Sequence, residues 1–339
     1  MLYAHLTGGV IAGMVTSLLL HPLDVLKVRL QVDSSSLFLD RRGILIQTAQ
    51  TLWKEEGLRG FYRGAFPGLL GSGSSWGLYF FLYEGCKQRL YNESTYEKNE
   101  KNEKNRIRSI PNAIEQEDTK RVILEKNPPT LSKITLTTSQ HMYAAWEAGS
   151  ITCIFTNPLW LVKTRMQLQK DNAIIRQGGM HSYAKEVPYK GLIDAFICII
   201  RDEGIFALYR GIGPALLLTS HGMIQFGVYE ALKESFPTNY QGIGGSADQA
   251  FRFFLFGAIS KAVATTATYP YQVIKSRIQQ RLVNGTPVYK GFIDCVRKIN
   301  TNEGIGGFYK GFIANLLRVA PQSAVTLVIY EQVKNTLEK

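Results

Sequence analysis

PLWLVKTRMQ, residues 158–167, decides how this chain of 339 residues is organised, because the same skeleton occurs twice more. Residues 22–31 read PLDVLKVRLQ, and residues 270–279 read PYQVIKSRIQ. In each copy Lys follows Pro by five positions, Arg by seven and Gln by nine. Three decapeptides with the same internal offsets predict a fold built from three repeats.

Two further signatures recur with each decapeptide. The first runs from an acidic-Gly pair to an aromatic-basic-Gly triplet, at residues 56–64, 203–211 and 303–311. The second is Tyr-Glu-x-x-Lys, at residues 83–87, 229–233 and 330–334. The glycines of the first signature suit a helix C-cap and a tight turn into the next helix. Each repeat is therefore predicted to hold a long helix, a short amphipathic helix and a second long helix, which gives six long helices.

The repeats divide the chain into four predicted segments. Residues 1–92, 137–236 and 247–339 are the repeats, and residues 93–136 separate the first repeat from the second. Residues 97–105 read EKNEKNEKN, a polar run that cannot bury enough apolar surface to fold. We expect residues 93–136 to be a disordered polar insertion, with a regulatory or partner-binding role as an alternative to a plain linker.

The predicted long helices have the length of a membrane span but not its uniform apolar character. A span needs about 20 residues, whereas the mean hydropathy of the chain is only −0.06. Polar residues inside a membrane face the bundle interior or water, so six helices around a wet cavity would account for both observations. A soluble helical solenoid is the alternative, and the 31 glycines and the kinking prolines fit it poorly.

Charge and cysteine content narrow the function classes. A net charge of +12 indicates a polyanionic partner: nucleic acid, an anionic membrane surface or an anionic small molecule. The four cysteines have no CxxC or CxxH spacing, so we expect buried thiols rather than disulfides or a zinc site. No secretory signal is visible, which favours an internal targeting signal or a truncated start. We find no nucleophile–base pair, metal cluster or phosphate-cradling loop and predict no enzymatic activity.

The three signatures resemble those of the mitochondrial carrier family. Further stretches are most similar to its folate/FAD transporters: NPLW at 157–160, SWGLYF at 75–80, TSHG at 219–222, TYPYQV at 268–273 and NLLRV at 315–319. Tryptophan in the second decapeptide is also seen in pyrimidine-nucleotide and NAD carriers. The resemblance implies an all-α, multi-pass protein of the mitochondrial inner membrane, a monomer with six transmembrane helices in three pseudo-symmetric repeats, each with a short amphipathic matrix helix.

The resemblance also implies a gate at the matrix mouth, where the acidic residue of one decapeptide pairs with the lysine of the next. Here only Asp24 is acidic, because Trp160 and Gln272 occupy the other two positions, which leaves the pair Asp24–Lys163. We expect Lys27 to bond to Gln272, and Lys275 to lie against Trp160 in a cation–π contact. The three glutamines would brace the closed gate from below: Gln31, Gln167 and Gln279.

The Tyr-Glu-x-x-Lys signatures imply a second gate at the cytoplasmic mouth. Its residues are Glu84, Glu230 and Glu331 with Lys87, Lys233 and Lys334. Three potential ion pairs against one at the matrix side predict a cytoplasmic gate at least as strong as the matrix gate. The alternative for each Glu-x-x-Lys is a solvated i,i+3 pair within one helix.

Symmetry predicts a substrate site between the gates. Counting back nine and five residues from each repeated Glu gives Ser75, Tyr79, His221, Gln225, Gln322 and Thr326. Arg318 and Lys261 are cations without an equivalent in the other repeats, and intramembrane cations are usually functional. The Arg318 fork suits a carboxylate or phosphate. Trp76, Tyr79 and His221 would stack a planar ring, although Trp76 packing between helices is an equal alternative.

Several glycines and lysines are expected to hold cardiolipin, as the resemblance implies: Gly64, Lys190, Gly191, Gly211, Lys290, Gly291 and Gly311. Much of the positive charge would then face the membrane, so we discount nucleic acid. The prediction is a carrier for a bulky anionic cofactor, folate or FAD, that needs no cofactor or metal of its own. The alternatives are a carrier for NAD or pyrimidine nucleotides, a non-transporting outer-membrane adaptor and a soluble scaffold.

Overall fold

The computed structural model of the chain describes residues 13–33, 41–109, 137–169, 188–236, 246–283 and 285–337. These residues form helices, apart from turns and one isolated β-bridge between Val283 and Thr286. The described part therefore bears out the expected all-α class. The elements are α2 (His21–Val32), α3 (Arg41–Phe61), α4 (Ala65–Ser109), α6 (Thr138–Leu168), α8 (Leu192–Glu203), η1 (Ile205–Tyr209), α9 (Ile212–Leu217), α10 (Ser220–Ser235), α11 (Ser246–Ile278), α12 (Phe292–Glu303), η2 (Ile305–Tyr309) and α13 (Phe312–Leu337).

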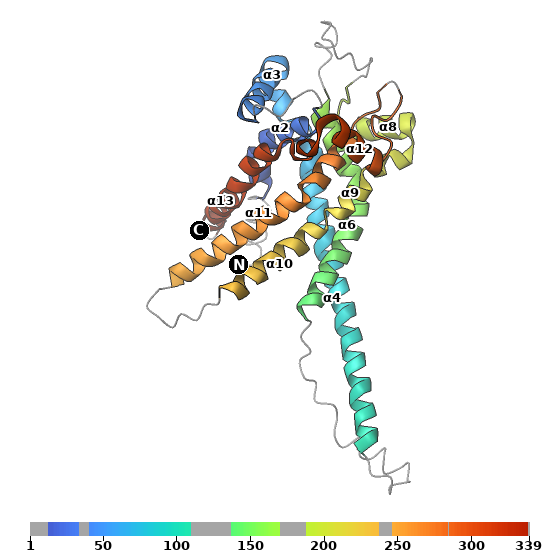
Figure 1. Cartoon of the computed structure of the whole chain (residues 1–339), viewed down its shortest axis with the longest axis vertical. Coiled ribbons are helices and arrows are strands. Elements are labelled where there is room, and N and C mark those ends of the chain that lie inside the picture. The colour runs from blue at the N-terminus through green and yellow to red at the C-terminus, as the bar shows by residue number, and fades with distance from the viewer. Residues whose placement is uncertain are drawn as a thin grey trace. The chain divides into compact units, whose positions relative to one another are not determined.

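The chain divides into two compact units. The main unit comprises Met1–Trp76 and Cys153–Lys339, and the second unit comprises Gly77–Thr152. Helices α4 and α6 run through both units. In the main unit, α10 lies beside α11, and α2 contacts both α11 and α13 (Figure 1).

The repeated prolines lie where a helix can accept them. Pro22 is in the first turn of α2, where its missing amide hydrogen costs no helical bond. Residues 13–19 are also helical, so the chain interrupts its first helix just before Pro22, as expected from the sequence. Pro158 and Pro270 lie inside α6 and α11. The decapeptides thus make up nearly all of α2 and lie at the C-terminal ends of α6 and α11.

The acidic-Gly signatures end the short helices with left-handed glycines. Gly57, Gly204 and Gly304 have φ of 62°, 83° and 67°. Each directly follows the glutamate that ends a regular helical stretch, because Gly57 is non-helical inside the α3 range and Gly204 and Gly304 cap α8 and α12. Only glycine adopts this conformation without a steric penalty. The predicted C-caps are therefore present in all three repeats.

The short helices bury one face. Leu52 in α3, Ile199 in α8 and Ile299 in α12 are each at most 1% exposed. They pack against the decapeptide helix of their own repeat. The opposite faces retain exposed apolar side chains, such as Ile193 and Ile293. The short helices are thus amphipathic about their buried core, as predicted.

Two expectations differ from the structure. Residues 93–109 continue α4 as a helix, because Glu and Lys are good helix formers and pair four residues apart, as in Lys104–Glu100 at 2.5 Å. The remaining residues of the expected insertion, 110–136, lie outside the described residues.

The second difference is in the second repeat, where the expected long helix is broken between α9 and α10. At the break, Thr219 and Ser220 donate their hydroxyls to the carbonyls of Leu216 and Leu217.

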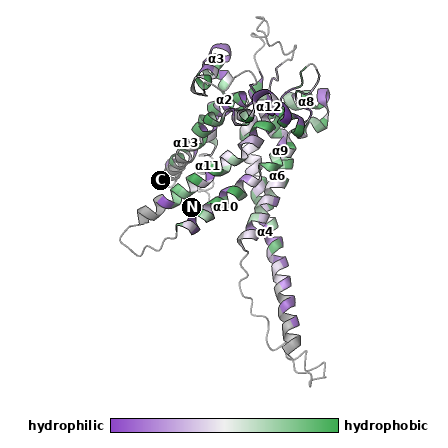
Figure 2. Cartoon of the chain, viewed as in Figure 1, coloured by the Kyte–Doolittle hydropathy of each residue, from purple (hydrophilic) through white to green (hydrophobic). Residues whose placement is uncertain are grey.

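The described helices are not uniformly apolar. Figure 2 shows apolar and polar residues interspersed along α10, α11 and α13. Among the helices described, none contains an 18-residue stretch that is apolar enough to qualify as a membrane span.

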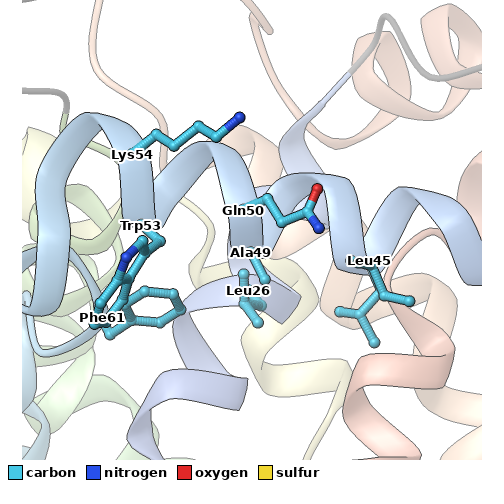
Figure 3. A pocket seen from close by; sticks show the side chains of 8 residues that line it. Leu26, Leu45, Ala49, Gln50, Trp53, Lys54 and Phe61 are labelled. Carbon is cyan, nitrogen blue, oxygen red and sulfur yellow. The ribbon is translucent and has the colours of Figure 1, made fainter.

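An apolar groove separates α2 from α3. It has a volume of about 500 Å³ and is lined by Leu26, Leu45, Ile46, Ala49, Gln50, Trp53, Lys54 and Phe61. The Trp53 and Phe61 rings lie at one end of the groove and Leu45 at the other (Figure 3). In the second repeat, the equivalent short helix packs against buried Tyr189, and the first repeat has no tyrosine at that position.

Candidate functional site

The decapeptides meet around a single carboxylate, that of Asp24. Lys163 Nζ lies 2.6 Å from Asp24 Oδ2, and Gln167 Nε2 donates to the same oxygen at 3.0 Å. Arg318 Nε lies 3.7 Å from Asp24 Oδ1. The Asp24 and Lys163 side chains are only 16% and 15% exposed. The ion pair expected between the first and second decapeptides is therefore formed, and it lies largely away from solvent.

The other two lysines of the decapeptides have no carboxylate partner among the described residues. Lys27 Nζ donates to the amide oxygen of Gln272 at 2.9 Å, the contact expected from the sequence. Lys275 makes no hydrogen bond or ion pair to the described part of the chain. The decapeptides therefore bring three lysines together with one carboxylate, Asp24, and one neutral amide, Gln272.

The expected contact between Lys275 and Trp160 is wrong. Instead, Lys163 Nζ lies over the Trp160 ring, 5.0 Å from its centroid. The reason is local, since residues three apart on a helix share a face. The indole Nε1 of Trp160 donates to Ser75 Oγ at 3.2 Å, so this tryptophan links α6 to α4.

The three glutamines join neighbouring decapeptides. Gln167 donates to Asp24, as described above. Gln279 accepts a hydrogen bond from Thr164 Oγ1 at 3.1 Å, and Gln31 accepts one from Ser276 Oγ at 2.7 Å. Each glutamine thus bonds to a residue of another repeat: the second to the first, the third to the second and the first to the third. The three glutamines therefore make the contacts between repeats that a bracing role requires, and their action in a gate stays a prediction.

The arginines of the decapeptides form a second network, which we did not predict. Arg165 pairs with Glu203 at 2.5 Å, and Arg277 pairs with Glu303 at 2.5 Å. The first repeat has the same arrangement, with Arg29 2.9 Å from Glu56. In every repeat the decapeptide arginine is therefore tied to the acidic residue that precedes the left-handed glycine of the same repeat.

The same arginines also reach across to a neighbouring repeat. The Nε atoms of Arg29, Arg165 and Arg277 donate to the backbone carbonyls of Gln167, Gln279 and Gln31 at 3.1, 3.1 and 2.9 Å. These carbonyls lie at helix C-termini, where they lack intrahelical partners and carry a partial negative charge. The links close a cycle from the first repeat to the second, the third and back to the first. We call it the arginine cycle.

Glu303, the acidic residue of the arginine cycle in the third repeat, is held in its charged form. Burial of Glu303 raises its pKa, but hydrogen bonds from Arg277 and Lys310 outweigh this effect, so the pKa lies below its ordinary value. Lys310 Nζ is 2.9 Å from Glu303 and comes from the aromatic-basic-Gly triplet. Glu303 therefore forms ion pairs both with Arg277 of the third decapeptide and with Lys310 of the aromatic-basic-Gly triplet.

Glycines let the repeats approach one another closely. Gly64, Gly211 and Gly311 have φ of 75°, 77° and 76°. A Cβ atom on Gly64 would lie 2.9 Å from the carbonyl oxygen of Lys163, and one on Gly311 would lie 2.9 Å from that of Lys27. One on Gly211 would meet Gln279 Cγ at 3.0 Å. These three glycines therefore serve the contact between repeats as well as the turn.

Sequence similarity to known proteins agrees with this threefold arrangement. The profile of the family described as mitochondrial carrier protein matches residues 1–94, 135–240 and 246–339. The chain belongs to the mitochondrial carrier family. The six-helix, three-repeat fold of that family is therefore its fold, and the family consists of transporters rather than enzymes.

Individual relatives of this carrier differ in what they transport. Folate transporter 1, chloroplastic, of Arabidopsis thaliana is 37% identical, covering 99% of this chain and 96% of its own. Nicotinamide adenine dinucleotide transporter 2, mitochondrial, of the same plant is 32% identical over 97% of this chain and 78% of its own. The mitochondrial nicotinamide adenine dinucleotide transporter 1 of Saccharomyces cerevisiae is 30% identical over 97% of this chain and 76% of its own.

The predicted substrate residues of this carrier are only partly connected. Arg318 contacts Asp24, and Ser75 contacts Trp160, so both touch residues of the expected matrix gate rather than a separate layer. His221 Nδ1 is hydrogen-bonded to Thr268 Oγ1 at 3.1 Å, and Lys261 is close enough to act electrostatically on His221. The other predicted residues have these positions: Trp76 is 62% exposed, Gln225 and Gln322 are half-buried in α10 and α13, and Tyr79 belongs to the second unit.

The lysine–glutamate pairs of the expected cytoplasmic gate are local in this structure. Lys87 pairs with Glu84 at 2.7 Å, and Lys233 approaches Glu230 at 3.7 Å, each within its own helix. Both pairs are largely exposed, so the i,i+3 alternative is what the structure shows for them. The side chains of Glu331 and Lys334 lie outside the described residues.

The expected lipid positions lie at helix N-termini. Gly191 and Gly291 are the N-caps of α8 and α12, with no side-chain capping bond. The backbone amides of Lys190 and Lys290 donate to Asp194 and Asp294 at 2.8 and 2.9 Å. Each helix thus begins at an uncapped glycine and carries an aspartate in its first turn, and whether its N-terminus binds a lipid phosphate stays a prediction.

Proposed function

We propose that this carrier moves a bulky anionic cofactor, folate or FAD, across the mitochondrial inner membrane by alternating access. The observation that supports this most is the set of links from one carboxylate, Asp24, to Lys163, Gln167 and Arg318 on other repeats. Few, reversible bonds between repeats are what a gate needs. They hold the matrix side closed, and their loss separates the helices.

The opposite side differs in a way that fits one state of the cycle. The Glu84–Lys87 and Glu230–Lys233 pairs are each satisfied within one helix, whereas the Asp24 links cross between repeats. We therefore propose that this structure represents a state in which the contacts of the matrix gate are formed. Exposed ion pairs are worth about 0 to 1 kcal/mol each, so substrate binding is sufficient to exchange one set for the other.

The chemistry of the predicted substrate residues supports a large planar anion. Arg318 supplies a guanidinium fork for a carboxylate or a phosphate. Trp160 and Trp76 offer aromatic faces, and His221 and Lys261 add polar and cationic groups. The greater identity to a folate transporter than to the NAD transporters favours folate or FAD, and those NAD transporters make NAD the second candidate.

The lipid and location parts of the proposal follow from the same geometry. The N-termini of α8 and α12 would offer backbone amides and the positive ends of their helix dipoles to the phosphates of cardiolipin, and exposed isoleucines such as Ile193 and Ile293 would enter the lipid. We propose that this carrier works as a monomer, with its short helices at the matrix surface of the inner membrane.

Reconstituted uptake tests the proposal directly. Purified carrier in cardiolipin-containing liposomes should take up labelled FAD or a reduced folate, and NAD and pyrimidine nucleotides should compete weakly. Arg318→Ala should abolish uptake while the folded protein is recovered in full, because the substrate anion loses its fork. Uptake of NAD alone would shift the function to the second candidate, and normal FAD or folate uptake by Arg318→Ala would remove Arg318 from the site.

A further inference from the structure

The charges around Asp24 do not balance. Four cations gather there, which we call the cation cluster: Lys27, Lys163, Lys275 and Arg318. Among the described residues, Asp24 is the only carboxylate in contact with it. The imbalance has a sequence origin, because Trp160 and Gln272 stand where the signature has acidic residues.

Only one member of the cation cluster has a full counter-charge. Lys163 holds Asp24 at 2.6 Å. Arg318 approaches the other Asp24 oxygen at 3.7 Å, and its Nε is buried without a hydrogen-bond partner. Lys27 has the neutral amide of Gln272 at 2.9 Å. Lys275 has neither a hydrogen bond nor an ion pair with any residue that the structure describes.

The three under-compensated cations come from adjoining helices. Lys27 is in α2, Lys275 in α11 and Arg318 in α13, and α2 contacts both other helices (Figure 1). Lys27 is 9% exposed and lies within electrostatic range of Arg318, Lys163 and Lys275. Bringing like charges together out of water costs free energy unless an anion joins them. The cluster is therefore arranged to take an anion.

We propose that Lys27, Lys275 and Arg318 form a binding site for a substrate group with two or more negative charges, a dicarboxylate or a diphosphate. This inference rests on the proposed transport function and specifies which end of the substrate enters first. The dicarboxylate tail of a folate and the diphosphate of FAD share this chemistry. A neutral ring system without such a group does not bind there.

The site is coupled to the gate through shared atoms. An anion that binds Arg318 competes with Asp24 for the same guanidinium, and it supplies to Lys27 and Lys275 the negative charge that the neutral amide of Gln272 lacks. Substrate binding would thus weaken one contact of Asp24 while relieving repulsion in the cluster. The gate opens only when the anion has replaced these interactions.

The decisive variant is Lys275→Gln in the full-length carrier. Without ligand, its melting temperature should be higher than that of the wild type, because a repelling charge has gone. The rise in melting temperature caused by FAD or a reduced folate should be lost, and KM for uptake should increase about tenfold, as expected for one lost charged hydrogen bond. Riboflavin, which lacks the diphosphate, should behave alike with both proteins.

Three further variants separate this site from a simple gate contact. Lys163→Gln removes a paired cation of the same cluster and should lower the ligand-free melting temperature. Lys101→Gln, an exposed position on α4, should match the wild type throughout. Gln272→Glu places a carboxylate beside Lys27, so it should raise ligand-free stability and reduce anion affinity. A substitution that only damaged the structure would instead lower the stability.

The outcomes are distinguishable from failure of the proposed function. If the wild type transports FAD or folate and Lys275→Gln retains the same KM and the same ligand-induced shift, the anion site is wrong while the function stands. If the wild type transports neither, the function fails. Inorganic pyrophosphate that stabilises the wild type but not Lys275→Gln would then still support the site. Equal stabilisation of both proteins by pyrophosphate would overturn it.

Discussion

Arg165 and Arg277 have fully buried side chains, and each serves two repeats at once. The two Nη atoms of the guanidinium donate to a glutamate of its own repeat, and Nε donates to a backbone carbonyl of another decapeptide. Arginine suits this role because it stays charged and presents several donors in a fixed plane. A lysine in the same place would satisfy one partner and leave the other without a donor.

At the residue scale, Arg277→Lys should lower stability by about 1 to 3 kcal/mol, since lysine keeps the charge but leaves either Glu303 or the Gln31 carbonyl without its donor. Thermal unfolding of purified carrier measures it. The exposed pair Arg201–Asp202 provides the control, because Arg201→Lys should shift the melting temperature little. Equal effects of the two substitutions would show that the arginine cycle is not what stabilises the contact between the three repeats.

Acid should weaken the same network. The folded pKa of Glu303 lies below its ordinary value because bonds from Arg277 and Lys310 outweigh burial. A carboxyl whose pKa is depressed by folding contributes stability above its unfolded pKa of about 4.3. That contribution is lost as the pH falls through the folded pKa.

Glu303→Gln should therefore destabilise the carrier most at pH 7, with a difference from the wild type that shrinks in acid below the ordinary glutamate pKa. Melting temperatures of both proteins across this pH range give the measurement. A difference that does not change with pH would mean that the glutamate acts by shape and not by charge.

At the element scale, the glycines after the short helices have separable roles. Gly304→Ala forces a left-handed φ on alanine, although nothing lies within 4 Å of the new methyl group. Gly311→Ala imposes the same strain and also places the methyl group 2.9 Å from the Lys27 carbonyl.

Gly304→Ala should therefore cost about 1 to 3 kcal/mol, because its φ of 67° and ψ of −167° lie in a region that only glycine populates freely. Gly311→Ala should cost more and also reduce uptake, because it separates the third repeat from the first. Unfolding curves and liposome uptake for the two variants test this. Gly85→Ala, in the middle of α4 with open space around it, should be neutral or slightly stabilising. A Gly311→Ala carrier no less stable than Gly304→Ala would contradict the close contact.

The elements also show which features the sequence was able to predict. Fixed offsets in the three copies predicted kinked helices, glycine C-caps and the Lys27–Gln272 contact, because these depend on local geometry and threefold symmetry. The Trp160 contact was wrong, since the nearby Lys163 on the same helix reaches the ring first. The continuation of α4 through residues 93–109 was not predicted from their low apolar content. Glu and Lys favour a helix by propensity and by i,i+4 ion pairs such as Lys104–Glu100, without burying apolar surface.

The arginine cycle was missed for a different reason. Its glutamates and arginines were visible as repeated positions, 27, 38 and 26 residues apart in the three repeats. Their partners, however, include backbone carbonyls at the ends of other helices, and sequence alone does not show where those carbonyls lie. The sequence signal for these ion pairs was the recurrence, in all three repeats, of the decapeptide arginine together with the glutamate before the glycine.

At the scale of the whole molecule, threefold order and its exceptions have different functions. The arginine cycle, the glutamines and the glycines follow the symmetry and hold the three repeats together. Asp24, Trp160, Gln272, Lys261 and Arg318 break the symmetry and surround the place where substrate is proposed to bind. An asymmetric ligand requires such departures from threefold symmetry.

The central claim is that the Asp24–Lys163 bond is the reversible contact of the matrix gate. The most direct measurement is a double-mutant cycle of Asp24→Asn and Lys163→Gln on the rate of cofactor uptake by reconstituted carrier. The account predicts that each single variant loses most of the uptake and that the double variant is no worse than either. Losses that multiply, or full uptake by Asp24→Asn, would contradict it.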